Sequence, residues 1–356
     1  MPLSSAQLEL QDKSQPSTLG KSQKSQPKGP LALRFLRGLG YFIKGLAILL
    51  LAGALFEQLG AWTDNRRFPP TGTRVKLADG RRLYLDCRGS GSPTVLLEAG
   101  HRNWSPAWTL VQPQVAQFTR VCSYDRAGLG LSDSGPRPRT AHAAATDLTQ
   151  LLHQAAIPPP YVLVGHSAGG MYSRVFTDLH RDQVAGLVLV DTDVPTDSED
   201  RAKIGSAPDD RRTAVVLTLL TYSGVFRFLV QTLHVSVGPP AADRYPEEGK
   251  VRLRAGMSAL ARSINDEWDL YKDAYLSVRS QPLGALPVVV IAALGYRPDE
   301  SDRADWLRRQ KSLSLLSSQG KLITLLDEAH YVPFLQPDVV TGAVRDVVQS
   351  VRAAGY

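Results

Sequence analysis

The chain has 356 residues, of which 43% are hydrophobic and 21% are charged, and its formal net charge is +7. This composition excludes a wholly disordered chain, and the length allows one α/β domain with an insertion and a large buried core. Its two cysteines, Cys87 and Cys122, are too few for a disulfide scaffold and lack the spacing of a metal site.

The positive charge is concentrated near the N-terminus. Residues 1–44 hold seven Lys or Arg residues against Glu9 and Asp12, so five of the seven net charges lie there. The rest of the chain has no basic stripe interleaved with aromatic residues, which argues against nucleic acid as a partner. Residues 1–30 are rich in Ser, Gln, Lys and Pro without apolar periodicity, and we expect a disordered basic tail.

An apolar segment follows the tail. Gly45–Phe56 contains no charge, and its extension to Trp62 would span about 27 Å as a helix, just enough to cross a bilayer. We predict a transmembrane or signal-anchor helix over residues 41–62, with aromatic residues near both ends. A core or interfacial helix is one alternative, and a signal peptide cleaved near Ala52–Ala54 is another.

The sequence indicates less clearly which end of this helix faces the cytoplasm. Basic residues before it favour a cytoplasmic N-terminus, with the following domain outside the cytoplasm. That asymmetry is weakened by basic residues soon after the helix, namely Arg66, Arg67, Arg74, Lys76, Arg81 and Arg82.

From residue 70 onward, short β-branched runs alternate with helical stretches. This alternation predicts a doubly wound, mostly parallel sheet of eight strands flanked by helices, with the first two strands forming an antiparallel edge. The expected strands are Thr73–Lys76, Leu83–Cys87, Thr94–Glu98, Arg120–Tyr124, Tyr161–Val164, Gly186–Val190, Pro287–Ala292 and Lys321–Leu326.

The interval between Asp191 and Pro287 is too long for an ordinary crossover. It contains apolar helical runs, at Thr213–Leu220, Phe226–Leu233 and Met257–Val278. We expect a helical cap at about residues 193–284, inserted in a domain of residues 70–356 and covering the C-terminal end of the sheet.

The main chemical motif is Gly165-His166-Ser167-Ala168-Gly169, which matches G-x-S-x-G. A strand-like run precedes it and a helix-compatible stretch follows, as a nucleophile on a sharp strand-to-helix turn requires. The two flanking glycines leave room for such a turn. Ser167 is therefore the candidate nucleophile, and the alternative is a Gly/Ser-rich turn without chemistry.

A serine nucleophile needs a general base, and His330 fits because it follows the last expected strand and lies after Ser167 in the chain. Five other histidines fit less well, since they lie within the G-x-S-x-G motif, on predicted helices or in the insertion: His166, His142, His153, His180 and His234.

The carboxylate that would orient His330 is ambiguous in the sequence. We favour Asp191, at the end of the sixth expected strand, although this residue could simply close the strand. The region after the seventh expected strand offers Asp299, Glu300 and Asp302 as alternatives.

An oxyanion hole needs two N–H donors. Ala168 follows the nucleophile, and His101 follows Ala99-Gly100 in the loop after the third expected strand. The backbone N–H groups of Ala168 and His101 are the candidates. The His101 side chain either points into the pocket or, as we favour, has no role beyond that of its backbone.

Several segments together resemble the α/β-hydrolase superfamily. They are EAGHRNWSPAW, SYDRAGLGLSD (Ser123–Asp133), GHSAGG, GLVLVD and EAHYVPFLQPDVV, and the resemblance covers about residues 70–354. With its hydrophobic segment and FPP-T-G linker (Phe68–Gly72), the chain is similar to membrane-anchored microbial serine hydrolases of this superfamily.

The resemblance implies a serine hydrolase that cleaves ester-like acyl bonds through an acyl-enzyme, without a cofactor or metal. The apolar cap and the membrane segment favour a hydrophobic small substrate. Peptidase or C–C bond hydrolase activity, and a binding protein on a hydrolase fold, are the alternatives.

The resemblance also places the second and fourth strands side by side, so Cys87 and Cys122 form either a disulfide or two buried free thiols.

Overall fold

The computed structural model describes residues 31–195, 202–204, 211–233 and 245–355. The predicted tail of residues 1–30 and His234 lie outside the described residues. The chain divides into two compact units, Met1–Leu49 and Leu50–Tyr356.

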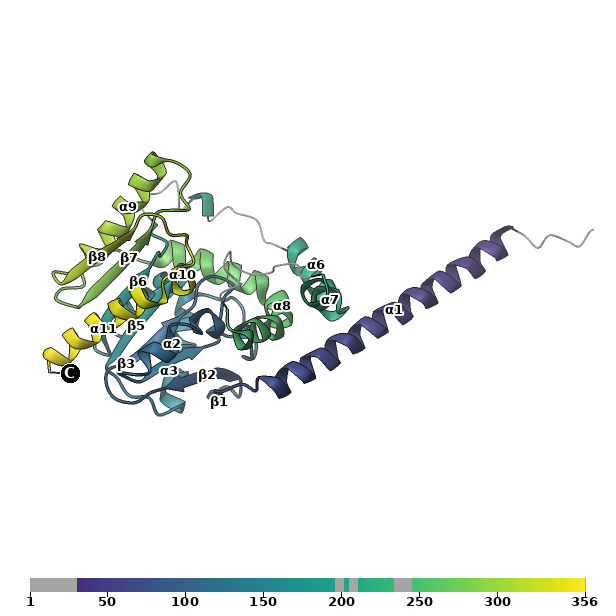
Figure 1. The fold of residues 1–356 in the computed structure, drawn as a ribbon, viewed down its shortest axis with the longest axis horizontal. Coiled ribbons are helices and arrows are strands. Elements are labelled where there is room, and N and C mark those ends of the chain that lie inside the picture. The colour runs from purple at the N-terminus through teal and green to yellow at the C-terminus, as the bar shows by residue number, and fades with distance from the viewer. Residues whose placement is uncertain (1–30, 196–201, 205–210, 234–244, 356) are drawn as a thin grey trace, which may run out of the picture. The chain divides into compact units, whose positions relative to one another are not determined.

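The eight expected strands form one sheet in the order β1-β2-β4-β3-β5-β6-β7-β8 (Figure 1). β1 pairs antiparallel with β2, β2 pairs antiparallel with β4, and the other neighbours are parallel. The mostly parallel sheet with an antiparallel edge is thus confirmed. The strands are β1 (Thr73–Lys76), β2 (Arg82–Arg88), β3 (Thr94–Glu98), β4 (Val121–Tyr124), β5 (Tyr161–His166), β6 (Val184–Val190), β7 (Val288–Ala293) and β8 (Gly320–Leu325).

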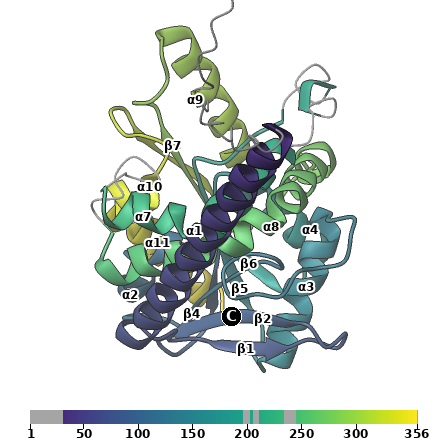
Figure 2. The same ribbon diagram turned by 90° about the vertical axis from the view of Figure 1, so that its right-hand side faces the viewer.

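Helices cover both faces of this sheet, because the central strands are apolar on both sides. In β3, Val95 and Leu97 join the core under one layer of helices, and Leu96 joins the core on the opposite face. Figure 2 shows α2 and α11 on one side of the sheet and α3 and α4 on the other. The helices of the hydrolase domain outside the insertion are η1 (Ser105–Trp108), α2 (Gln112–Val115), α3 (Ala141–Gln154), α4 (Ala168–Leu179), α9 (Glu300–Ser314), α10 (Val332–Leu335) and α11 (Pro337–Ala353).

The N-terminal apolar helix is present as α1 (Leu31–Arg67). It extends beyond the predicted 41–62 in both directions, because no proline interrupts the helical stretch between Pro30 and Pro69. The described part of the interval after β6 is helical, with α6 (Arg211–Tyr222), α7 (Val225–Gln231) and the long α8 (Glu247–Ser277). Glu267 of α8 accepts a hydrogen bond from the backbone of Arg102, so α8 reaches the loop at the C-terminal end of β3.

The two cysteines lie opposite each other in the antiparallel pair of β2 and β4. Cys87 and Cys122 form a disulfide bond. Of the two arrangements left open by the sequence, the structure has the bonded one.

Candidate active site

Ser167 lies on a sharp turn between β5 and α4. Its φ of +54° is unusual for a residue with a side chain, and such strain occurs mainly at functional sites. The Ser167 N–H donates to the carbonyl of Val190 (3.0 Å), and its carbonyl accepts from Thr192 Oγ1 (2.5 Å). The backbone of Ser167 is therefore held by the two residues that flank Asp191.

The turn depends on glycine at two positions. A Cβ atom on Gly165 would lie 2.5 Å from the carbonyl oxygen of Gly169, and one on Gly169 would lie 2.3 Å from that of Glu98. Both distances are far shorter than a carbon–oxygen contact allows. The motif thus has glycine at the two positions where only glycine fits. A sharp turn from a strand into a helix requires this.

Asp191 is fully buried at the end of β6 and contacts His330. Its Oδ2 lies 2.7 Å from His330 Nδ1 and also accepts from the Tyr296 hydroxyl (2.9 Å). Its Oδ1 accepts from the Ala293 N–H (3.0 Å) and from Trp306 Nε1 (2.7 Å). All four hydrogen bonds stabilise an ionised carboxylate aimed at one ring nitrogen of His330.

These contacts set the charge state of Asp191 and the tautomer of His330. Burial alone would raise the pKa of Asp191, but its hydrogen bond to His330 and the others outweigh burial and hold that pKa below its usual value. Because the ionised carboxylate only accepts, His330 carries its proton on Nδ1. Its Nε2 is then free to accept a proton.

The three alternative carboxylates lie at the start of α9. Asp299 caps this helix, with its Oδ1 accepting from the Asp302 N–H (2.8 Å). Asp302 pairs with Arg297 across 3.7 Å, and Glu300 occupies the first turn. The structure brings Asp191, and none of these three, into hydrogen-bonding contact with His330.

His166 connects the loop of His330 to the serine turn. The two rings are 4.8 Å apart, and His166 Nε2 lies 2.8 Å from the His330 carbonyl oxygen. Since a carbonyl only accepts, this nitrogen carries the proton. His166 is buried, and burial together with the nearby His330 lowers its pKa to about 3.

This buried neutral histidine should make the fold sensitive to acid. Between about pH 6.5 and about pH 3 the unfolded chain binds a proton at residue 166 that the folded chain does not, so stability falls as the pH falls. We expect His166→Asn to flatten this loss, measured by denaturant unfolding at about pH 7 and about pH 4. His153→Asn, at an exposed position, is the control and should keep the wild-type slope. An unchanged slope in His166→Asn would contradict this assignment.

The other described histidines lie in surroundings that suit packing or solvent. His142 and His153 are exposed, and His180 packs against Phe176 with its Nε2 2.9 Å from Thr149 Oγ1.

The loop after β3 passes directly over Ser167. A Cβ atom on Gly100 would lie 3.1 Å from the Cβ of Ser167, so the loop backbone and the serine are in close approach. Ala168 begins α4, where the first N–H groups of a helix lack intrahelical partners. The structure therefore brings both expected oxyanion donors, Ala168 and His101, to the loop and turn around Ser167.

The His101 side chain packs against α8. Its ring lies 5.1 Å from that of Tyr271 and 5.9 Å from that of Trp268, both on α8. Burial lowers the pKa of His101 to about 4, so this ring is neutral at pH 7.

Arg126 holds the loop after β3 in place. The sequence analysis assigned no role to this residue. Its NH1 donates to Glu98 Oε1 (2.8 Å) and to the Ala99 carbonyl (2.7 Å). Its NH2 donates to the Gly100 carbonyl (2.9 Å) and to Glu267 Oε2 (2.7 Å). The guanidinium is buried and so ties the sheet, the loop and α8 together. Its place within SYDRAGLGLSD was visible in the sequence, but its partners were not.

Among the residues that the structure describes, no group of three or more His, Cys, Asp or Glu side chains could hold a metal ion.

Comparison with known proteins agrees with this architecture. A family model described as "Alpha/beta hydrolase family" matches residues 89–343. An uncharacterised vacuolar membrane protein of Saccharomyces cerevisiae is 36% identical over 104 residues, which are 28% of this chain and 16% of that protein's length.

Solved structures show the same fold. The epoxide hydrolase CorEH has a TM-score of 0.58 and 22% identity, covering 79% of this chain and 99% of its own. A thermophilic esterase from Thermogutta terrifontis has a TM-score of 0.55 and 21% identity, covering 79% and 99%. Similarity at this level of identity shows a shared fold and leaves the reaction to the site itself.

Proposed function

Since this chain belongs to the alpha/beta hydrolase family, we propose that it is a serine hydrolase that cleaves an ester-like acyl bond through an acyl-enzyme on Ser167. The observation that carries the proposal is the hydrogen bond between His330 and the buried Asp191, beside the strained turn of Ser167. A carboxylate, an imidazole and a serine hydroxyl in this order are the components of nucleophilic acyl transfer.

The proposed reaction has two stages. His330 Nε2 takes the Ser167 proton while Ser167 Oγ attacks the ester carbonyl, and Asp191 stabilises the imidazolium. The N–H groups of Ala168 and His101 hold the oxyanion. His330 then gives the proton to the leaving alcohol, activates a water molecule, and the water releases the acid from Ser167.

The residue at the turn separates this proposal from other chemistries of the fold. Epoxide hydrolases and dehalogenases of this fold need a carboxylate nucleophile at that position, and this chain has Ser167 there. The esterase among the structural neighbours is therefore the better guide to reaction class than CorEH.

We further propose that α1 anchors the enzyme in a membrane as a single span. The helix from Leu33 to Arg67 contains an 18-residue stretch of mean hydropathy 2.0, none of which is buried. The Cys87–Cys122 disulfide supports a catalytic domain outside the cytoplasm, because disulfides persist in oxidising compartments. A membrane location favours a hydrophobic substrate.

Labelling with a fluorophosphonate probe tests the proposed nucleophile. We expect the wild-type chain to be labelled covalently and Ser167→Ala to lose labelling, because the probe reacts only with an activated serine. Ser90→Ala, at an exposed loop position, is the control and should be labelled like wild type. Folded wild-type protein that takes no label would favour a binding protein over an enzyme.

A further inference from the structure

The cap carries an apolar surface next to α1. Among the described residues from Leu50 onward, large exposed apolar side chains gather on α1 and on the α6–α7 hairpin, and elsewhere they occur singly. A concentration of exposed apolar side chains of this kind marks an interaction site. We call it the apolar surface; it consists of Leu50, Leu51, Leu55, Phe56, Leu59 and Trp62 of α1 with Val215, Val216, Leu219, Tyr222, Val225, Phe228 and Leu233 of the hairpin region.

The turn of the hairpin rests against the backbone of α1. α6 and α7 meet at an angle of 74°, and Gly224 in the turn has a φ of +73°. A Cβ atom on Gly224 would lie 2.2 Å from the Gly53 carbonyl oxygen, and one on Gly53 would lie 1.9 Å from that of Ser223. Figure 1 shows α6 and α7 beside α1. The hairpin thus meets α1 at Gly53.

Ion pairs then hold α7 along the following turns of α1. Arg227 lies 3.0 Å from Glu57 and 2.7 Å from Asp64, and its side chain is only 2% exposed. Arg254 of α8 lies 3.5 Å from the same Asp64. An acidic side chain at the edge of a bilayer is costly unless it is paired. Arg227 supplies this pairing for both carboxylates.

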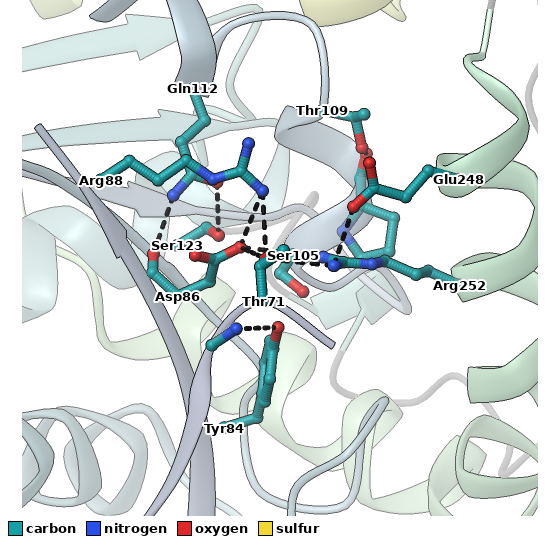
Figure 3. Close-up of polar contacts among 12 residues, drawn as sticks. Thr71, Tyr84, Asp86, Arg88, Ser105, Thr109, Gln112, Ser123, Glu248 and Arg252 are labelled. Atoms are coloured by element: carbon teal, nitrogen blue, oxygen red, sulfur yellow. Dashed lines mark hydrogen bonds and ion pairs between the residues drawn. The ribbon is translucent and has the colours of Figure 1, made fainter. Parts of the chain in front are cut away.

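The linker after α1 is fixed as well, by the polar cluster of Figure 3. The buried carboxylate of Asp86 accepts from Thr71 Oγ1 (2.6 Å) and from Arg88 (3.1 Å). Arg252 of α8 donates to Thr71 Oγ1 (3.0 Å) and lies 3.7 Å from Asp86. The last turns of α1, the linker and the cap therefore hold one arrangement.

We propose that the α6–α7 hairpin is a second membrane-contacting element, which enters the same face of the bilayer that α1 enters. This inference rests on the proposed membrane anchoring of α1. The apolar side chains of the hairpin lie next to those of α1, because the turn of the hairpin contacts α1 at Gly53. A lipid bilayer is the occupant that covers both faces at once.

The position of the hairpin along α1 fits a shallow insertion. Arg66 stacks over Trp62 at 3.9 Å, and Trp and Arg side chains are typical of the membrane–water interface. Glu57 is the charged residue of α1 nearest to Gly53 in sequence, and we take it as the boundary of the hydrocarbon region. Gly53 then lies four residues deeper, about 6 Å along a helix at ~1.5 Å per residue. A hairpin turn at that level lies at the depth of interfacial amphipathic helices, about 5–10 Å.

The consequence for the enzyme concerns how substrate arrives. α6 packs against α8, and α8 carries Trp268 and Tyr271 against the loop of His101. A bilayer in contact with the hairpin therefore lies one helix away from the proposed oxyanion loop. The substrate class that suits this arrangement is an acyl ester dissolved in lipid.

Fluorescence quenching in vesicles tests the hairpin directly. Single cysteines are introduced into the full-length chain by Leu219→Cys or Phe228→Cys and labelled with a nitrobenzoxadiazole maleimide under non-reducing conditions, where the disulfide keeps Cys87 and Cys122 unreactive. The variants are reconstituted in phosphatidylcholine–phosphatidylglycerol vesicles containing doxyl-labelled lipid. Ile48→Cys in α1 is the bilayer control, and Leu315→Cys, which is 72% exposed after α9, is the water control.

We expect the probe at positions 219 and 228 to show blue-shifted emission that the doxyl lipid quenches, like the probe at position 48. The probe at position 315 should show no quenching. If 48 is quenched while 219 and 228 behave like 315, the hairpin proposal is wrong and the anchor stands. If 219 and 228 are blue-shifted without quenching, protein covers the hairpin, from a second copy or another partner, and the proposal is also wrong. If 48 itself is not quenched, the anchor proposal fails first.

Discussion

Replacing Asp191 with Asn should lower kcat on an ester substrate by about 10⁴-fold, the order expected when the acid of such a triad loses its charge. The Asn side chain has nearly the same shape, so its Oδ1 keeps the hydrogen bonds from Ala293 and Trp306. Its amide NH₂ would face His330 Nδ1, which must then accept a proton rather than donate one. His330 would be held with its proton on Nε2, the nitrogen that has to take the serine proton.

Asp299→Asn is the matched control for this prediction. Asp299 is the alternative acid in the sequence, and it caps α9 instead of contacting His330. We expect it to keep near wild-type kcat and stability, since Asn caps a helix about as well as Asp does and the substitution leaves the site intact. Steady-state kinetics on a short soluble ester distinguishes the two. If the large loss occurs in Asp299→Asn and not in Asp191→Asn, the proposed acid is wrong.

Arg126→Met should destabilise the fold by about 3–5 kcal/mol, the usual cost of removing one partner from a buried ion pair. Two carboxylates, Glu98 and Glu267, would remain buried without their counter-charge. The carbonyls of Ala99 and Gly100 would also lose their donor, so the loop that carries His101 should loosen. Denaturant unfolding measures the first effect, and the fluorophosphonate labelling rate measures the second.

Arg137→Met is the control for Arg126. Arg137 also pairs with an acidic residue of α8, Asp266, but its side chain is 65% exposed. A pair open to solvent contributes less than about 1 kcal/mol, so this variant should unfold close to wild type. Equal destabilisation by the two substitutions would show that burial of the Arg126 pairs does not matter.

Much of the fold was predictable because its signals are local. Each strand is a short run rich in β-branched residues. The spacing of apolar residues, which distinguishes a strand from a helix, can be recognised within about ten residues. The turn at Ser167 was predictable for the same reason: strand, small residues and helix are contiguous from Tyr161 to Gly170.

The partner of His330 was not determined by the sequence, which left Asp191 and the acids at the start of α9 as competing candidates. The choice depends on hydrogen bonds to Asp191 from residues about a hundred positions later, Ala293, Tyr296 and Trp306. Arg126 is a similar case, since its partner Glu267 lies 141 residues away.

By itself, then, the sequence determined the sheet, the serine turn, the order of serine and histidine, and the apolar helix. The tertiary structure decided which carboxylate contacts His330, that Cys87 and Cys122 are bonded, and that the hairpin lies on α1. The physical reason is the same in each case. Backbone preference and apolar periodicity act between near neighbours, whereas the desolvation and pairing of a buried charge depend on side chains that only the folded chain brings together.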